Sequence, residues 1–263
     1  MLIAITRAVS PTLAQCELTH LPRDPIDVAR AIAEHALYEG ALRSLGATVV
    51  RAPAEPDLPD AVFVEDTALA LDEVAVLTRP GSPTRQREVD SMVQALGAYR
   101  PLLRILAPGT LDGGDVLRVG RKLSVGKSSR SNAEGIAQLG ALLKEWDYEV
   151  IGVPFEGCLH LKSAVTQVAE RLLLMNPKYV GADRFAPMEA LPVAPAEPDG
   201  ANALWVAEAG AVIYADHHPE TAGRLDRAGV RIVPVPATEL AKAEGGVTCC
   251  VVLLNAPNAA ATP

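Results

Sequence analysis

Apolar positions along the chain alternate in short strand-like runs and recur as helical stripes, and the same order of elements returns roughly every 45–50 residues. The third copy is the clearest. Residues 115–119 and 123–125 flank a Gly-Arg-Lys turn and predict a hairpin. Ser131 to Glu134 matches a capping box, an apolar stripe predicts a helix after it, and residues 148–154 predict a closing strand. The repeated unit is therefore strand, strand, helix, strand.

Three other stretches follow this order. The second copy has strands at 61–69 and 74–77, a helix striped by Val89, Met92, Val93 and Leu96, and a strand at 102–106. The fourth has strands at 164–168 and 171–175, a short or missing helix, and a long proline-rich loop at 186–200. The fifth has strands at 203–206 and 211–214, a helix near 220–228 and a strand at 230–233.

The first copy lacks its first strand. It has a strand at 2–6, a helix at 28–45 and a strand at 48–50, while an unpaired apolar run at 249–254 stands at the other terminus. Pairing this run with the first copy would complete a ring without an open edge. We therefore predict an α/β fold, a five-bladed α/β propeller closed by the C-terminal strand, in one domain over 1–255 with a flexible tail at 256–263. An open α/β sheet is the alternative, although parallel strands joined by helices explain the hairpins less well.

Composition narrows the class of protein. The chain has 263 residues, 49% of them hydrophobic, which excludes a disordered chain. A net charge of −8 argues against nucleic acid or an anionic membrane surface as a partner. No apolar run is long enough to span a bilayer, and the start of the chain resembles a strand, not a signal peptide. Four cysteines without framework spacing indicate free thiols, so we expect a cytoplasmic protein.

Polar residues gather where the first strand of successive units begins. They are Glu65 and Asp66, Asp112, His160 and Cys249. Equivalent strand ends converge on the axis of a ring, so these groups are predicted to share a central cavity. Each also has a purely structural interpretation: a buried thiol, a packed histidine, or a turn aspartate before Gly-Gly. Cys250, on the opposite face of the predicted strand, is expected to pack in the core.

Two further interpretations concern ligands. Cys249, Cys250 and His160 could ligate zinc, but no Cys-x-x-Cys or His-x-x-His spacing supports such a site. Arg85 and Arg130 both stand where the second strand of a unit passes into its helix. Two guanidinium groups beside helix N-termini favour a carboxylate site, although two unrelated surface arginines are the alternative.

Four segments carry a resemblance to a known family. Phe63 to Thr67 (Phe-Val-Glu-Asp-Thr), Leu111 to Leu117 (Leu-Asp-Gly-Gly-Asp-Val-Leu), Leu159 to Ser163 (Leu-His-Leu-Lys-Ser) and Thr248 to Cys250 (Thr-Cys-Cys) closely resemble dimethylarginine dimethylaminohydrolase. The resemblance is ordered along the chain from Arg7 to Asn255. It implies the five-bladed propeller of the guanidine-modifying superfamily, which agrees with the ring predicted above.

The resemblance also implies an activity. The enzyme would convert asymmetric dimethylarginine or monomethylarginine to citrulline, and it would need no metal or organic cofactor. Cys249 would be the nucleophile, His160 the general acid and base, and Asp112 the carboxylate that orients the histidine. The substrate would be bound by Asp60, Phe63, Glu65, Asp66, Arg85 and Arg130, and by Leu18 on a mobile lid at residues 13–24.

Within this resemblance the individual roles differ. Glu65 and Asp66 would hold the guanidinium, Arg85 and Arg130 the α-carboxylate, and Asp60 the α-amino group. An arginine deiminase, an amidinotransferase and a non-catalytic guanidine-binding protein are the alternatives. The expected partner is a small methylated arginine; the sequence is also compatible with an oligomer.

Overall fold

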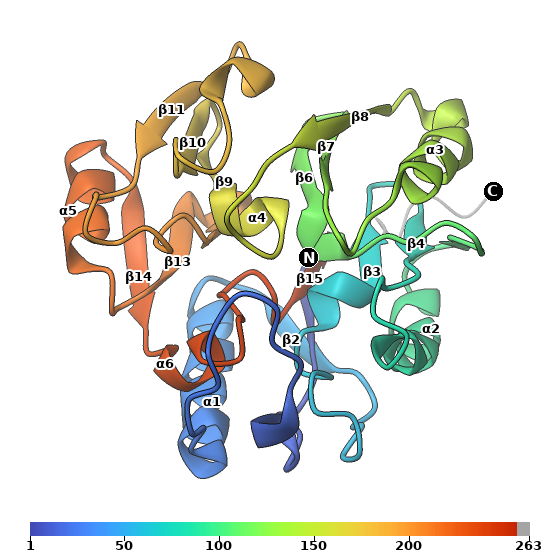
Figure 1. Ribbon diagram of the computed structural model, residues 1–263, viewed down its shortest axis with the longest axis horizontal. Coiled ribbons are helices and arrows are strands. Elements are labelled where there is room, and N and C mark those ends of the chain that lie inside the picture. The colour runs from blue at the N-terminus through green and yellow to red at the C-terminus, as the bar shows by residue number, and fades with distance from the viewer. Residues whose placement is uncertain (257–263) are drawn as a thin grey trace.

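The computed structural model describes residues 1–256, and they form five three-stranded sheets arranged around a central axis (Figure 1). The five-bladed α/β propeller is confirmed. Residues 257–263, most of the predicted tail, lie outside the described part of the chain. Among residues 1–256, no helix combines the length and the apolar character that crossing a membrane requires.

All five blades share one topology. The first strand runs antiparallel to the second, and the second runs parallel to the third. The blades, in the order of their strands, are β15 (Val252–Asn255), β1 (Leu2–Thr6) and β2 (Thr48–Arg51); β3 (Ala68–Ala70), β4 (Ala75–Leu77) and β5 (Leu102–Arg104); β6 (Val116–Val119), β7 (Lys122–Lys127) and β8 (Glu149–Pro154); β9 (Val165–Ala169), β10 (Leu172–Met175) and β11 (Glu189–Pro192); and β12 (Ala203–Val206), β13 (Ala211–Ala215) and β14 (Arg231–Val235).

The parallel step of four blades is made through a helix, as parallel strands require. These helices are α1 (Val28–Ser44), α2 (Val89–Gly97), α3 (Ala133–Leu142) and α5 (Pro219–Arg227). The fourth blade has only a 3₁₀ turn at Ala182–Phe185, which confirms its predicted short or missing helix. Two further helices have a single turn: α4 (Leu161–Ala164) lies near the middle of the ring, and α6 (Thr238–Ala241) lies beside α1 (Figure 1).

The ring closes as predicted. β15 pairs antiparallel with β1, with Ile3 opposite Leu254, so the C-terminal segment supplies the missing strand. Apolar clusters then join adjacent blades: one combines Ile3 and Leu254 with Leu77 of β4 and Met92 of α2, all nearly or fully buried. Each such side chain stabilises the fold by about 1.5–3 kcal/mol. The rigid ring fixes the positions of the segments at its centre.

Several predicted boundaries were wrong. The run at 61–67 is not strand: Val64–Thr67 is a 3₁₀ turn and β3 begins only at Ala68. The run at 249–251 likewise forms a turn, so β15 begins three residues after Cys249. The proline-rich loop contains β11, where Pro192 is tolerated because β11 is an edge strand. Asn132, not Ser131, caps α3 by accepting from the Gly135 N–H at 2.8 Å.

Candidate active site

A small closed cavity of about 20 Å³ brings together most of the predicted site residues. Asp60, Phe63, Asp66, Arg85, Arg130, His160 and Cys249 all line it, with Glu17, Leu159, Ala243, Glu244 and Gly245. This volume holds little more than one water molecule. An arginine-sized ligand is larger than this volume, so side chains that line the cavity must move to admit one.

Tight turns ahead of the inner strands, and not the strands themselves, present the chemical groups. Asp66 lies in the turn before β3, Asp112 precedes the 3₁₀ turn Gly113–Asp115 before β6, and His160 precedes α4. The Gly-Gly pair after Asp112 has a steric reason. A Cβ on Gly114 would lie 2.6 Å from His160 Nδ1 and 2.7 Å from Asp66 Oδ1. Glycine is thus required for the close approach of these turns.

His160 lies between two buried carboxylates. Its Nε2 is 3.1 Å from Asp112 Oδ2, and its Nδ1 is 3.8 Å from Asp66 Oδ1. Burial lowers the pKa of His160, but Asp66, Asp112 and Asp115 outweigh burial and raise it to about 9. The imidazole is therefore protonated at neutral pH and can act as a general acid. Asp112 is itself held by the Gly81 N–H, which donates to Oδ1 at 2.8 Å.

Cys249 is buried, and its sulfur accepts from the Gly246 N–H at 3.2 Å. Burial, together with the negative charges of Glu65 and Asp66, raises the pKa of its thiol to about 12. The cysteine is thus a neutral thiol until a cation enters the cavity and stabilises the thiolate. Cys250 is also buried but does not line the cavity, in agreement with its predicted place in the core.

Asp66 and Arg85 form a buried pair at 2.6 Å. Burial would raise the pKa of Asp66, but His160, Arg85 and the Gly114 N–H lower it to about 2. Arg85 also donates to both oxygens of Glu88 and to the Phe63 carbonyl, so most of its donors already have partners. Asp66 therefore stays ionised as a fixed anion beside Cys249 and His160.

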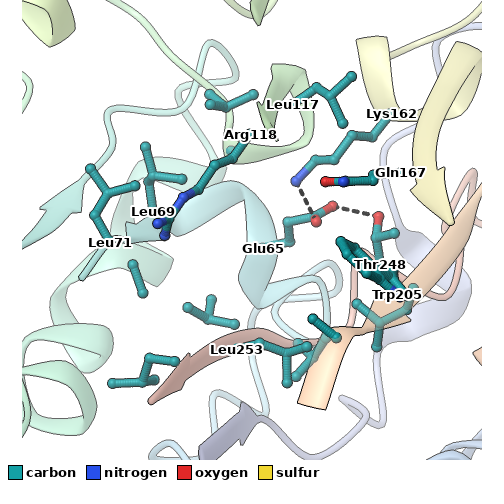
Figure 2. Close-up of a pocket in the computed structure, with 18 of the residues that line it drawn as sticks. Glu65, Leu69, Leu71, Leu117, Arg118, Lys162, Gln167, Trp205, Thr248 and Leu253 are labelled. Carbon is teal, nitrogen blue, oxygen red and sulfur yellow. Dashed lines mark hydrogen bonds and ion pairs between the residues drawn. The ribbon is translucent and has the colours of Figure 1, made fainter. Parts of the chain in front are cut away.

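Three predicted residues do not line the small cavity: Asp112 contacts His160 from outside it, and Glu65 and Leu18 are placed elsewhere. Glu65 does not line the small cavity: it pairs with Lys162 Nζ at 2.5 Å, accepts from Thr248 Oγ1 at 2.8 Å, and borders a second cavity of about 450 Å³ (Figure 2). Leu18 packs partly buried against the apolar cluster around Leu13 and does not line the small cavity. Their predicted roles toward a substrate stay predictions.

Sequence reasoning missed several groups that position or line the cavity. Asp115 accepts from Ser128, Ser131 and the Leu161 N–H, and so ties the Arg130 loop to the start of α4. The Leu-Asp-Gly-Gly-Asp motif contains it, and that motif was the available signal. Glu17 and Glu244 meet the site only through contacts between distant segments, for which the sequence carries no local pattern.

One cluster has the geometry of a potential cation site. Among residues 1–256, ligand atoms of Asp66, Asp112 and His160 lie within 4.8 Å of one another. Arg85 and the Gly114 N–H already donate to Asp66, and the raised pKa of His160 favours a proton on its ring. This cluster does not include Cys249 or Cys250, so it differs from the zinc site considered from the sequence.

Similarity to characterised proteins agrees with this geometry. No protein-family model matches the chain. The N(G),N(G)-dimethylarginine dimethylaminohydrolase of Streptomyces coelicolor is 34% identical over 253 residues, covering 96% of each chain. The Pseudomonas aeruginosa enzyme of that name is 33% identical over 225 residues, covering 85% of this chain and 88% of its own.

Comparison with solved structures indicates the same family. The P. aeruginosa enzyme, as a cysteine-to-serine variant complexed with citrulline, superposes with a TM-score of 0.88 at 30% identity and covers 95% of this chain and 98% of its own. A histidine-to-glycine variant of a dimethylarginine dimethylaminohydrolase, as an adduct with S-methyl-L-thiocitrulline, has a TM-score of 0.90 at 30% identity, covering 97% and 100%. The chain belongs to the dimethylarginine dimethylaminohydrolase family.

Proposed function

We propose that the protein hydrolyses asymmetric dimethylarginine to citrulline and dimethylamine, and monomethylarginine to citrulline and methylamine. The single observation that carries this proposal is the meeting of Cys249, His160 and Asp66 in one closed cavity, with Asp112 behind the histidine. A thiol, a protonated imidazole and a fixed anion are the groups needed for nucleophilic attack on a guanidinium carbon.

The reaction follows from the charge of each group. A bound guanidinium cation near Cys249 lowers the pKa of the thiol, which releases its proton to solvent. The thiolate then attacks the guanidinium carbon to form a carbon–sulfur bond. His160 donates its proton to the departing dimethylamine as the carbon–nitrogen bond breaks. A thiouronium adduct remains on Cys249. The neutral His160 then takes a proton from water, and the resulting hydroxide adds to the same carbon. The carbon–sulfur bond breaks with its electron pair returning to sulfur, the hydroxyl proton passes to that sulfur, and citrulline is released.

Substrate recognition follows the remaining charges around the cavity. Asp66 offers its carboxylate to the guanidinium, with Phe63 against the apolar part of the ligand and Asp60 and Arg130 at the other end. Arg85 contributes mainly by holding Asp66, because its guanidinium is already paired with Asp66 and Glu88. Glu65, whose negative charge adds to the effect of burial in raising the pKa of the Cys249 thiol, and Leu18 on the lid segment keep the substrate-binding roles predicted from the resemblance.

Methyl selectivity provides the test. Methyl groups on the leaving nitrogen need only apolar space, whereas a methyl on the other terminal nitrogen removes a hydrogen bond to a buried carboxylate, at about 1–3 kcal/mol. We expect asymmetric dimethylarginine and monomethylarginine to be preferred modestly over arginine, and symmetric dimethylarginine to be rejected more strongly. Comparing kcat/KM by citrulline formation checks this order. A clear preference for arginine would indicate a deiminase and contradict the proposal.

A further inference from the structure

The lid segment at residues 13–24 carries two acidic side chains, Glu17 and Asp24, and of these only Glu17 lies at the cavity. Glu17 lines the catalytic cavity, and its side chain is 33% exposed. Its Oε1 accepts from Ser82 Oγ at 2.7 Å and from Thr84 Oγ1. Burial raises the pKa of Glu17, but the two hydroxyls and Arg130 lower it below its usual value. Glu17 is therefore an ionised carboxylate held in one orientation at the wall of the cavity.

The neighbours of Glu17 form a site with both signs of charge. Its backbone N–H donates to Asp60 Oδ2 at 3.1 Å, so two carboxylates lie close together at this end of the cavity. Glu17 Oε2 is 3.4 Å from Arg130 Nη1. Within residues 1–256 that nitrogen is buried and has no hydrogen-bond partner, while Nη2 donates to Thr19 Oγ1. A buried donor without a partner is costly, and Arg130 is one of the residues that line the cavity.

The charged side chains at this end of the cavity determine which ligand group can bind there. Asp66 and Glu88 already neutralise Arg85, so Arg130 is the cation at this end with donor capacity left. It stands beside two carboxylates, Glu17 and Asp60. A carboxylate ligand alone would leave the acidic pair without a cation, and an ammonium alone would leave Arg130 Nη1 without an acceptor. A group that carries both charges satisfies both.

We propose that Glu17 is a specificity-determining residue that binds the α-ammonium group of the substrate together with Asp60, while Arg130 Nη1 binds the α-carboxylate. This inference rests on the proposed function. Glu17 then makes the lid segment part of the substrate-binding surface. Closure of the lid would place a carboxylate against the substrate as well as cover the cavity.

A second contact fixes the lid in place on the other side of Glu17. The carboxylate of Glu244 accepts from the backbone N–H groups of Thr19, His20 and Leu21. Glu244 thereby holds the lid through its backbone and makes no contact with Ser82 or Thr84. The two acidic residues act on the same segment, but only Glu17 stands beside both Asp60 and Arg130. Glu244 therefore offers a matched control.

The test compares ligands with and without the α-amino group in Glu17→Gln. The expected result is a fall of about 10-fold in kcat/KM for asymmetric dimethylarginine, mostly through KM, because a charged hydrogen bond at a partly exposed site is lost. The inhibition constant of the analogue with hydrogen in place of the α-amino group should stay within about twofold. Ser82→Ala, which loosens the Glu17 carboxylate, should show the same selectivity with a smaller loss. Glu244→Gln should weaken both ligands alike.

Two results would overturn the inference. Equal weakening of both ligands in Glu17→Gln would mean that Glu17 only holds the lid. A lower KM for dimethylarginine would mean that Glu17 competes with the substrate carboxylate for Arg130. Absence of citrulline formation by the unchanged protein would instead contradict the proposed function itself, whatever the variants show.

Discussion

Replacing Asp112 by asparagine removes the negative charge of the side chain and keeps its shape. Asp112 is fully buried, with Oδ2 at 3.1 Å from His160 Nε2 and Oδ1 accepting from the Gly81 N–H. Asparagine retains the size and the acceptor for Gly81 but removes the negative charge beside the imidazolium. A hydrogen bond to a charged group contributes about 1.5–3 kcal/mol, so we expect kcat to fall about 10–100-fold in Asp112→Asn. The same energy would lower the pKa of His160 from its value of about 9.

The assay is citrulline formation at saturating dimethylarginine from about pH 6 to about pH 10. Activity needs protonated His160, so the alkaline limb of kcat should move to lower pH by about 1–2 pH units in the variant. Asp72→Asn is the matched control, because Asp72 is an exposed carboxylate paired with Arg118 far from the cavity. An unchanged alkaline limb together with an unchanged kcat in Asp112→Asn would refute the assigned role of Asp112.

Three further predictions concern burial and close approach. His35 lies buried on α1, and burial lowers its pKa to about 4, so its contribution to stability is present above about pH 6.5 and is lost as the pH falls toward 4. In denaturant unfolding, His35→Leu should remove up to about 3 kcal/mol of this pH dependence. An equally steep loss of stability in the variant would contradict the reasoning. The Cys249 thiol, with a pKa of about 12, should react with iodoacetamide at a rate that still rises at pH 10 in the free protein; a plateau near neutral pH would show a preformed thiolate. Gly114→Ala should cut kcat at least about 10-fold because its Cβ would displace His160, whereas Gly223→Ala, with open space around it, should not; equal activity of the two variants would refute the steric argument.

The repeating blade and its closure could be predicted because they depend on local patterns. Alternating apolar residues identified the hairpins, and the unpaired run at each terminus indicated that β15 completes the first blade. The fine boundaries could not be predicted in the same way. A short apolar run such as 249–251 has the composition of a strand, yet its backbone turns, with the Val251 N–H donating to the Thr248 carbonyl.

Site residues could be predicted where a single motif contains them, but not where their contacts join segments that are distant in the sequence. Asp112, His160 and Cys249 precede the first strands of three of the five units, β6, β9 and β15, so the predicted ring brought them together. The pairing of Glu65 with Lys162 across 97 residues had no local signal, and neither did the contact of Glu17 with Arg130. Such contacts depend on which loops the folded ring brings face to face.

Nucleophilic attack by Cys249 can be tested by quenching the reaction with asymmetric dimethylarginine in acid and locating the covalent adduct by peptide mass spectrometry. We predict a thiouronium adduct on Cys249, formed with loss of dimethylamine, and no adduct in Cys249→Ser. An adduct on Cys250, or full citrulline formation by Cys249→Ser, would contradict this prediction.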